Sequence, residues 1–466
     1  MTKANITFSF FLLFLANANA QLVSTYIGQT GKEGYDLSTQ YRDSAYLNGP
    51  WGMAFDTNSN LYITEYFGHR IKMVTTDGSS VYIRSGSSAT LEGDRGYGEA
   101  AAGQAKWYSP GGIAMDKTTN SLVVADRDNH CIRRLSPYVN ATNSQISSFI
   151  AGGTDITESG YVNGTTFSAR FDQPYDLAVA ADGIIYVADA FNHCIRKIDE
   201  VNDEVTTFAG NGTKGFKDGQ DTSARFFLPC GICWDPNGDL LVADRYTYRI
   251  RKVNVASSPI GMVSTVAGSN NDDVLDGPIS TATFKLPTDV ACDKKGNIYV
   301  CEANNSTGGD RVNVIRKISN GKVTTIAGQN NTNGTANGLG VNARFDMPVS
   351  LLLDKSETML FVADLNNHAI RTIHLWPMGI SELMGNTYES TLEFFPNPTN
   401  GDYLNVSTDF EMKSIRITDL SGRILMTEQM KGKQAGLSIG VMANGVYIFT
   451  VAGTDGQQVS KKLLVK

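Results

Sequence analysis

The sequence has few cysteines and no excess of basic charge, and each shortage excludes a class of protein. Six Cys in 466 residues are too few for a scaffold held together by disulfides. The 40 Lys and Arg stand against 47 Asp and Glu, a net charge of −7, which argues against a nucleic acid ligand because phosphates require a basic surface. With only 13 Pro beside 46 Gly, the composition indicates many turns and not a collagen-like or disordered chain.

Long apolar runs are also missing beyond the first 20 residues, and no later stretch approaches the roughly 18 apolar residues that span a bilayer. At the start of the chain, Lys3 precedes a mostly apolar run from Ile6 to Ala16, and Ala18-Asn19-Ala20 fits the small-x-small rule for signal-peptide cleavage. This order predicts a signal peptide over residues 1–20 and therefore export. A buried N-terminal helix is the alternative.

The middle of the chain contains six copies of one repeat. Each copy has a proline and an apolar run, then an acidic residue and a basic strand, and all but the last end in a β-type run near a glycine. Six copies of four short strands predict a six-bladed β-propeller in an all-β chain. In the third copy we expect strands at 176–180, 184–188, 193–198 and 205–209. The prolines are Pro50, Pro110, Pro174, Pro229, Pro287 and Pro348.

The last repeat lacks a fourth strand, and the other end of the chain supplies a candidate. Residues 23–28, Val-Ser-Thr-Tyr-Ile-Gly, match residues 323–328, Val-Thr-Thr-Ile-Ala-Gly, and precede the first repeat without belonging to it. We therefore expect this N-terminal strand to close the ring as the outer strand of blade six, because closure removes an exposed sheet edge.

The connections between blades are long, roughly 18 to 24 residues, and end in an aromatic side chain three residues before the next proline. Such a large apolar group at the same place in successive repeats is expected to plug the junction between two blades. These residues are Trp107, Phe171, Phe226, Phe284 and Phe345.

The repeats resemble NHL repeats, a family of six-bladed propellers. The resemblance rests on two patterns, Pro-x-Gly-apolar-Ala-x-Asp and apolar-Ala-Asp-x-x-Asn-His-x-Ile-Arg, and covers residues 21–375. The second, third and sixth copies fit well, the first and fourth replace Asn or His, and the fifth contains an insertion. Some members of this family bind RNA through a basic propeller face, for which this acidic chain lacks the charge.

Residues 376–390 fit no repeat and are interpreted as a linker. Residues 391–466 contain about seven short strands, which predicts a small C-terminal β-sandwich. Phe-Pro-Asn-Pro at 395–398, Asp-Leu-Ser-Gly-Arg at 419–423, Gly-Val-Tyr-Ile-Phe at 445–449 and the basic end at 461–466 resemble the C-terminal sorting domain of type IX secretion cargo in Bacteroidetes. The resemblance implies export across both membranes, then release or attachment to surface lipopolysaccharide. An ordinary adhesive β-sandwich is the alternative.

Four of the five histidines occupy one repeat position. They either form a metal site near the propeller axis or each make the same hydrogen bond in its own blade. Because a residue that recurs in the blades usually makes the same contact in each, we interpret these imidazoles as hydrogen-bonded across their own hairpins. They are His69, His130, His193 and His368.

Each repeat also has an acid that is followed by a base in the next strand. A ring of six carboxylates can hold a cation, but a base beside every acid predicts local ion pairing or turn capping instead. The acids are Glu65, Asp126, Asp189, Asp244, Glu302 and Asp364, and the bases are Lys72, Arg133, Arg196, Arg251, Arg316 and Arg371.

Cys230 and Cys233 form a C-x-x-C pair, which is either a redox or metal motif or a pair of small buried thiols. We favour buried thiols, because Cys233 replaces a repeat alanine and no second C-x-x-C completes a zinc site. The sequence contains no G-x-S-x-G, P-loop, dinucleotide-binding or H-E-x-x-H motif. We therefore expect no metal and no cofactor, and assign no catalytic residue.

The largest departure from the repeat within a turn follows Glu302. From Glu302 to Arg316 is 14 positions, whereas from Asp126 to Arg133 is 7. The extra residues are polar loop formers, which indicates either a recognition loop or neutral drift. The candidate ligand-binding residues are Asn304, Asn305, Ser306, Thr307 and Asp310.

Together these features favour an exported, non-enzymatic binding module, at the cell surface or released, that presents a propeller rim to a protein or glycan. Its partners are then that ligand and the type IX secretion machinery, with no nucleic acid and no membrane span. One alternative is an enzyme at the propeller axis, such as a lyase or lactonase with or without a metal, which requires two or three non-repeated acids or histidines at one end of the channel. Another is a cell-envelope component with no discrete ligand.

Overall fold

The computed structural model describes residues 21–34, 41–42, 44–86, 95–99, 104–136, 147–153, 158–304, 311–375 and, in the C-terminal part, 392–395, 403–408, 410–418, 424–439, 442, 445–454 and 458–465. The expected signal peptide at 1–20 and linker at 376–390 lie outside these residues. One compact unit spans Gln21–Leu375, and Trp376–Lys466 belongs to a second. No helix in the described parts has the length and apolar character needed to cross a membrane.

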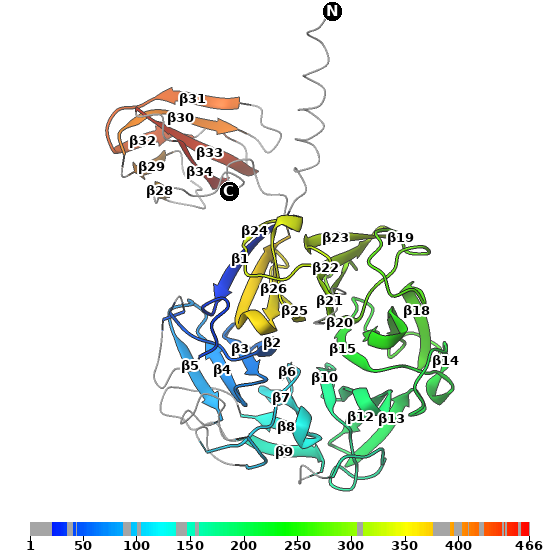
Figure 1. Cartoon of the computed structure of the whole chain (residues 1–466). Helices are drawn as coiled ribbons and strands as arrows, with labels where there is room; N and C mark the ends of the chain where they lie inside the picture. Colours follow the sequence, from blue (N-terminus) through cyan, green and yellow to red (C-terminus); the bar gives the residue numbers. More distant parts are fainter. Residues whose placement is uncertain are drawn as a thin grey trace, which may run out of the picture. The chain divides into compact units, whose positions relative to one another are not determined.

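The first unit is a six-bladed β-propeller, as the repeats predicted. Six antiparallel sheets surround an axis, with the first strand of each blade innermost (Figure 1). Blade 1 contains β2 (Pro50–Phe55), β3 (Leu61–Glu65), β4 (Arg70–Val74) and β5 (Val81–Ser85); blade 2 contains β6 (Ile113–Asp116), β7 (Ser121–Asp126), β8 (Cys131–Leu135) and β9 (Ser147–Gly152); blade 3 contains β10 (Pro174–Val179), β11 (Ile185–Asp189), β12 (Cys194–Asp199) and β13 (Glu204–Ala209). Blade 4 contains β15 (Pro229–Trp234), β16 (Leu240–Asp244), β17 (Arg249–Val253) and β18 (Met262–Gly268); blade 5 contains β20 (Pro287–Cys292), β21 (Ile298–Asn304), β22 (Val312–Ser319) and β23 (Lys322–Gly328); blade 6 contains β25 (Pro348–Leu353), β26 (Met359–Asp364), β27 (Ala369–His374) and β1 (Leu22–Ile27).

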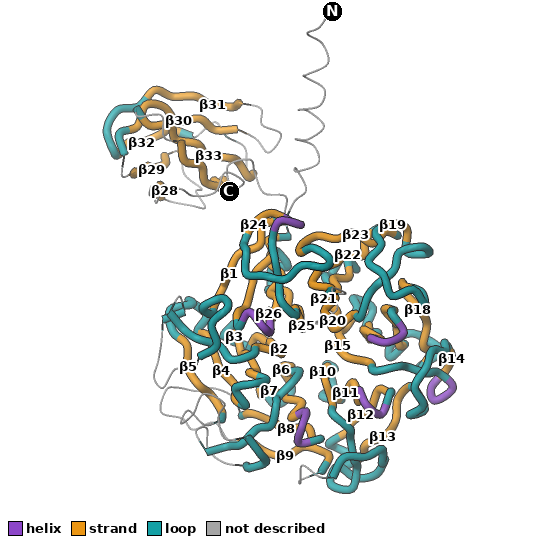
Figure 2. Tube along the Cα trace, viewed as in Figure 1, coloured by secondary structure: helices purple, strands orange, loops and turns teal. Residues whose placement is uncertain are grey.

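Short elements complete the blades. Two-residue strands add a fifth member to the outer edge of blades 4, 5 and 6, and single 3₁₀ turns connect the second strand to the third in blades 2, 3, 4 and 6 (Figure 2). The added strands are β14 (Gly219–Gln220), β19 (Gly277–Pro278) and β24 (Gly338–Leu339). The 3₁₀ turns are η1 (Arg127–Asn129), η2 (Ala190–Asn192), η4 (Arg245–Thr247) and η6 (Leu365–Asn367) between strands, with η3 (Asp221–Ser223) and η5 (Gly340–Asn342) in the connections before blades 4 and 6.

The strands expected in blade 3 are all present, with shifted ends. The first begins at Pro174, two residues early, because Pro174 already pairs with Asp189 ahead of a β-bulge. The third begins after His193, because that residue ends η2 in the left-handed conformation at φ 53°.

The expected closure of the ring by the N-terminal strand is confirmed. β1 pairs antiparallel with β27, and Val23 lies opposite Ile373. The hydroxyls of Ser24 and Thr372 are 2.9 Å apart across this pair. The far edge of β1 is covered in turn by β24, so both ends of the propeller sequence are held in one sheet.

Large side chains fill the junctions between blades, as the sequence predicted. Trp107 packs with buried residues of blades 1 and 2, including Tyr62 and Val124, and is fully buried. Phe171, Phe226, Phe284 and Phe345 occupy the next four junctions. Leu47 lies at the matching position before blade 1 and is also fully buried. An apolar side chain therefore seals every junction of the ring.

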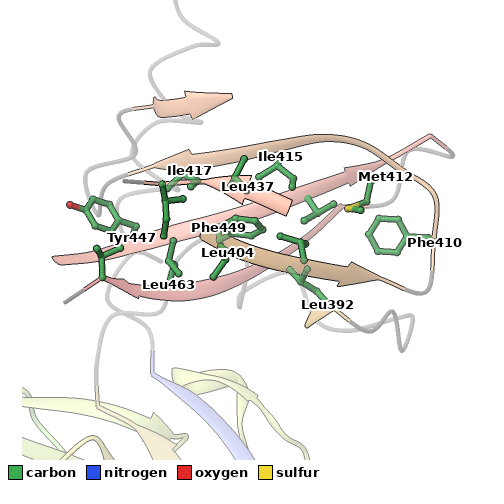
Figure 3. Close-up of a cluster of buried hydrophobic side chains, with 14 residues drawn as sticks. Leu392, Leu404, Phe410, Met412, Ile415, Ile417, Leu437, Tyr447, Phe449 and Leu463 are labelled. Atoms are coloured by element: carbon green, nitrogen blue, oxygen red, sulfur yellow. The ribbon is translucent and has the colours of Figure 1, made fainter. Parts of the chain in front are cut away.

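The second unit is a small β-sandwich of two sheets, again as expected. One shared core contains Leu404 and Leu437 from one sheet and Ile415, Phe449 and Leu463 from the other (Figure 3). The three-stranded sheet is formed by β28 (Leu392–Phe395), β29 (Tyr403–Thr408) and β32 (Gln434–Ser438), and the four-stranded sheet by β31 (Ile424–Gln429), β30 (Met412–Thr418), β33 (Gly445–Gly453) and β34 (Gln458–Val465).

Candidate functional site

The repeated acid and base form a buried ion pair inside each blade. In blade 3 the Asp189 carboxylate accepts hydrogen bonds from Arg196 Nη1 at 2.9 Å, Asn192 Nδ2 at 2.9 Å and the Asp172 N–H at 2.8 Å. Both charged groups are fully buried. The same pairing joins Asp126 to Arg133, Asp244 to Arg251, Glu302 to Arg316, Asp364 to Arg371 and, with a lysine, Glu65 to Lys72.

In each of the five pairs that contain an arginine, the arginine also binds the connection that precedes its blade. Arg196 donates to the Arg170 carbonyl at 2.8 Å and the Val162 carbonyl at 2.7 Å, and its guanidinium lies over the Phe171 ring at 5.0 Å. Burial raises the pKa of Asp189 to about 6, although Arg196 opposes the shift. The acids therefore pair locally and do not form a charged well at the axis.

The repeated histidines join neighbouring blades, so the prediction of a bond within each hairpin is wrong. The Nδ1 atom of His130 accepts the Gln173 backbone N–H at 3.1 Å, from the blade that follows. The left-handed conformation of the histidine at the end of its turn directs the imidazole across the junction. The equivalent bonds join His69 to Ser109, His193 to Leu228 and His368 to Gly49, and in blade 5 the Asn313 side-chain oxygen accepts from Met347.

This contact requires a neutral imidazole with a free Nδ1 lone pair. Burial lowers the pKa of His130, His193 and His368, which favours that form. Across the described residues, no three His, Cys, Asp or Glu side chains are grouped so that they could hold a metal ion.

The C-x-x-C pair is not joined. All six cysteines are free, and Cys230 and Cys233 line two different cavities, which are described below. Burial raises the pKa of Cys230 to about 12, so this thiol is not activated as a nucleophile.

The blades differ from one another at one end of the propeller axis, where the inner strands begin. A cavity of about 440 Å³, here called the mouth cavity, opens there between residues that follow the repeat proline and residues that follow the repeat acid. Its aromatic lining comes from Trp51, Tyr175, Phe191, Phe227 and Tyr246. These belong to blades 1, 3 and 4 or, for Phe227, to the connection into blade 4, so the cavity wall is not six-fold symmetric.

The aromatic rings contact one another, and two of them are partly exposed. Trp51 and Tyr175 meet edge to face with centroids 5.6 Å apart, and Phe227 and Tyr246 lie tilted at 5.0 Å. Phe191 is 44% exposed and Tyr246 is 42% exposed, which is a large exposure for apolar rings. The arrangement suits contact with a flat ligand ring.

Among the described residues, the charged lining of the mouth cavity is basic. Lys214 and Arg245 line it together with His193, and no described Asp or Glu does. Arg245 donates through Nη2 to the Ala303 carbonyl at 3.0 Å. Behind the wall, the Arg127 guanidinium lies 4.1 Å from the Tyr175 ring centroid and donates to the Tyr175 hydroxyl at 2.8 Å.

Two non-repeated acids narrow the axis below the mouth cavity. Asp176 accepts the Ile232 N–H at 2.9 Å, and Asp289 accepts the Leu351 N–H at 2.7 Å. The space around the two carboxyls is about 10 Å³, and it separates the mouth cavity from an opposite cavity of about 410 Å³. Burial raises the pKa of Asp176 to about 6, and burial together with the charge of Asp176 raises that of Asp289 well above its usual value.

Glycines make room for these two acids. A β-carbon on Gly112 would lie 2.0 Å from an Asp176 oxygen, and one on Gly231 would lie 1.9 Å from an Asp289 oxygen. Each acid therefore occupies the space of a side chain that its neighbouring blade lacks. Through this fit and the backbone hydrogen bonds, each of the two acids connects the inner strands of neighbouring blades.

The candidate loop of blade 5 is described only at its base. Asn304 ends β21 and pairs with Val312, while Asn305, Ser306, Thr307 and Asp310 lie outside the described residues. The preceding residue, Ala303, accepts the hydrogen bond from Arg245 of the mouth cavity. The base of the loop thus adjoins the cavity that the sequence did not reveal.

The sequence analysis did not find the mouth residues or the axis acids. A signal was present: the Gly of the Pro-x-Gly pattern is replaced by Asp only at Asp176 and Asp289, and the second residue after the repeat acid is aromatic only at Phe67, Phe191 and Tyr246. Both substitutions stand beside repeated residues, and only the structure shows that Asp176 and Asp289 lie at the axis and that Phe191 and Tyr246 line its mouth.

Two family models match this chain. The NHL repeat model matches residues 108–135, and the model described as "Secretion system C-terminal sorting domain" matches residues 393–466. The chain is an NHL-repeat protein that carries a C-terminal secretion sorting domain, and the sorting domain indicates export through the matching secretion machinery.

Relatives and solved structures agree with this assignment. Protein SUPPRESSOR OF QUENCHING 1, chloroplastic, from Arabidopsis thaliana is 30% identical over 45% of this chain, and human NHL repeat-containing protein 2 is 27% identical over 68%. The chain spans about a fifth of the first relative and about half of the second. An auxiliary nutrient binding protein from Bacteroides thetaiotaomicron has the same fold, with a TM-score of 0.55 at 17% identity and 76% coverage of both chains.

Proposed function

We propose that this chain is an exported, non-enzymatic binding protein that captures an extracellular ligand in the mouth cavity. The observation that carries the proposal is the convergence of five aromatic side chains on one cavity of about 440 Å³. This volume lies in the range of small-molecule sites, which are concave and mostly apolar. A concave wall of this size suits a sugar or another ring-bearing ligand better than a flat protein surface, so of the two ligand classes we favour a glycan.

The asymmetry of the wall supports a binding role. Residues that recur in every blade form the ion pairs and junction contacts of the scaffold. The mouth aromatics instead stand at two repeat positions that are aromatic in only some blades: Trp51 and Tyr175 follow the repeat proline, and Phe191 and Tyr246 are second after the repeat acid. Exposed rings such as Phe191 and Tyr246 contribute little to folding. Binding of a ligand at this opening would explain why these exposed rings are grouped there.

The expected signal peptide and the matched sorting domain support the proposal that this activity lies outside the cell, at the surface or after release. We include the blade 5 insertion from Asn304 to Asp310 in the proposal as a contributor to the rim, since its base adjoins Arg245. The likeness to an auxiliary nutrient binding protein concerns the fold at 17% identity, so the proposal rests on the cavity.

The test is binding of the mature protein, from Gln21 onward, to an array of oligosaccharides. Y246A and F191A each remove one exposed ring of the mouth cavity, and F167A removes a ring that is 70% exposed on the outer edge of the propeller. We expect binding to fall about tenfold or more in the first two variants and to stay unchanged in the third. Equal loss in F167A, or binding that no mouth variant weakens, contradicts the proposal.

One observation favours a second candidate, an enzyme at the axis. Asp176 and Asp289 are non-repeated acids with raised pKa values, as acid–base catalysis requires. However, each also binds a backbone N–H of a neighbouring blade, which accounts for it structurally. Loss of lyase or lactonase turnover in D289N, with binding intact, is the result that would establish this candidate.

A further inference from the structure

We infer that the ligand of the mouth cavity is a ring that carries an anionic group, a carboxylate in the first place, and that Lys214 and Arg245 bind this group. The inference rests on the proposed function and adds the chemical class. It concerns two cations that form no ion pair among the described residues and the rings beside them.

The sign of the charge in the cavity is opposite to that of the chain. The protein has a net charge of −7, yet the charged side chains among the described lining residues are Lys214 and Arg245, and His193 is a further titratable base. Arg127 adds a further cation behind Tyr175, within 4.1 Å of its ring centroid. A basic, partly enclosed site on an acidic protein concentrates anionic ligands and excludes cationic ones.

In the part of the chain that the structure describes, no carboxylate pairs with either lining cation, unlike the arginines of the scaffold. Arg251 is held by Asp244 and Asp218 and by two backbone carbonyls. No ion pair among the described residues involves Lys214 or Arg245, and the Arg245 side chain makes one hydrogen bond, to a carbonyl. A guanidinium has five N–H groups, so Arg245 retains donors for a carboxylate, which it can bind through two parallel hydrogen bonds.

The rings beside these cations set the shape of the ligand. The Lys214 ammonium lies 5.6 Å from the Phe227 ring centroid, and Phe227 in turn contacts Tyr246 at 5.0 Å. A ligand that stacks on these rings brings its substituents to the level of the ammonium. The shared chemistry is therefore a six-membered ring with one apolar face and an attached carboxylate, supplied by a uronic acid of a polysaccharide or by an aromatic acid.

The test measures binding of tetragalacturonate, its fully methyl-esterified form, benzoate and benzamide to the mature full-length protein by calorimetry at low and high salt. The variants are K214Q and R245Q, with K214R as the charge-conserving variant and K294Q as the control. Lys294 is a 78% exposed lysine outside the cavity.

We expect an acid to bind about tenfold or more tightly than its uncharged analogue. Affinity should fall by a similar factor in K214Q and R245Q and at high salt, and should be retained in K214R and K294Q. Preference for tetragalacturonate assigns the ligand to the sugar acids, and preference for benzoate assigns it to the aromatic acids.

Equal binding of acid and uncharged analogue, with loss only in Y246A, would overturn this inference and leave the proposed function standing. Failure of both acids to bind would also overturn it. Binding that no mouth variant affects would contradict the proposed function itself.

Discussion

The imidazole of His368 accepts a hydrogen bond from the backbone N–H of Gly49 at 3.1 Å, although the residues are 319 positions apart in the chain. Gly49 lies just before blade 1, and His368 lies in blade 6. The bond therefore spans the junction at which the ring closes, and it is the same contact that the other repeated histidines make between successive blades.

We predict that H368A is destabilised by about 1–3 kcal/mol, because it leaves the buried Gly49 N–H without its acceptor. H368N should recover most of the loss, since Asn313 makes the equivalent contact in blade 5 at 2.8 Å. Urea unfolding of both variants, with H374A as a control outside the repeat position, measures the difference. Equal stability of H368A and wild type would contradict a role for the junction bond.

Removal of the closing strand β1 should lower the stability of the propeller more than H368A does. A chain that begins at Gln29 loses β1 and with it the fully buried Val23 and Ile27, so we expect at least about 3 kcal/mol lower stability and an exposed edge on β27. Calorimetric melting of this chain beside the chain that begins at Gln21 measures the loss. Superimposable melting curves would contradict closure by β1.

The fold was largely predictable because it depends on residues that recur. Pro174, Asp189 and Arg196 have counterparts in other repeats, so their spacing gives the number of blades and the place of each strand. The pairing of β1 was predictable from one matching strand. The direction of the His130 side chain was not, because residue type alone does not reveal the left-handed backbone conformation that turns the ring toward the next blade. The mouth cavity was not predictable, because Trp51, Tyr175 and Tyr246 come from different repeats and meet only once the ring is closed.

The raised pKa of Asp176 at the axis predicts that the stability of the propeller depends on pH. The pKa of Asp176 is raised from its usual 3.8 to about 6 by burial. Its contribution to stability is therefore fully present below about pH 4 and is lost as the pH rises through about 6. D176N keeps an oxygen acceptor for Ile232 and removes this titration.

Relative to wild type, D176N should become progressively more stable between about pH 4 and about pH 7. Urea unfolding of both proteins across this range measures the difference, in which the contributions of carboxyl groups away from the axis cancel. Asp289 adds to the difference in the same direction, because D176N removes the Asp176 charge that helps to raise the Asp289 pKa. A difference that does not change with pH would show that Asp176 remains charged in the folded protein.

The C-terminal sandwich has its own core of Leu404, Ile415, Phe449 and Leu463, so the propeller should fold without it. We expect a chain that ends at Leu375 to melt like the propeller of the full-length protein but to stay in the periplasm. Cell fractionation of the producing bacterium, with the full chain as control, gives the readout. Normal levels of the truncated chain in the medium or at the surface would contradict the sorting role.

The measurement that tests ligand capture most directly is ¹⁹F NMR of the protein labelled with 5-fluorotryptophan. The chain has four Trp; Trp51 lines the mouth cavity, Trp234 lines the opposite cavity and Trp107 is buried between blades 1 and 2. Single Trp-to-Phe variants assign the signals, and tetragalacturonate and benzoate are the ligands titrated. We predict that the Trp51 signal shifts with saturation while those of Trp107 and Trp234 do not move. Saturable binding that shifts Trp234 and leaves Trp51 unchanged would place the ligand elsewhere and contradict it.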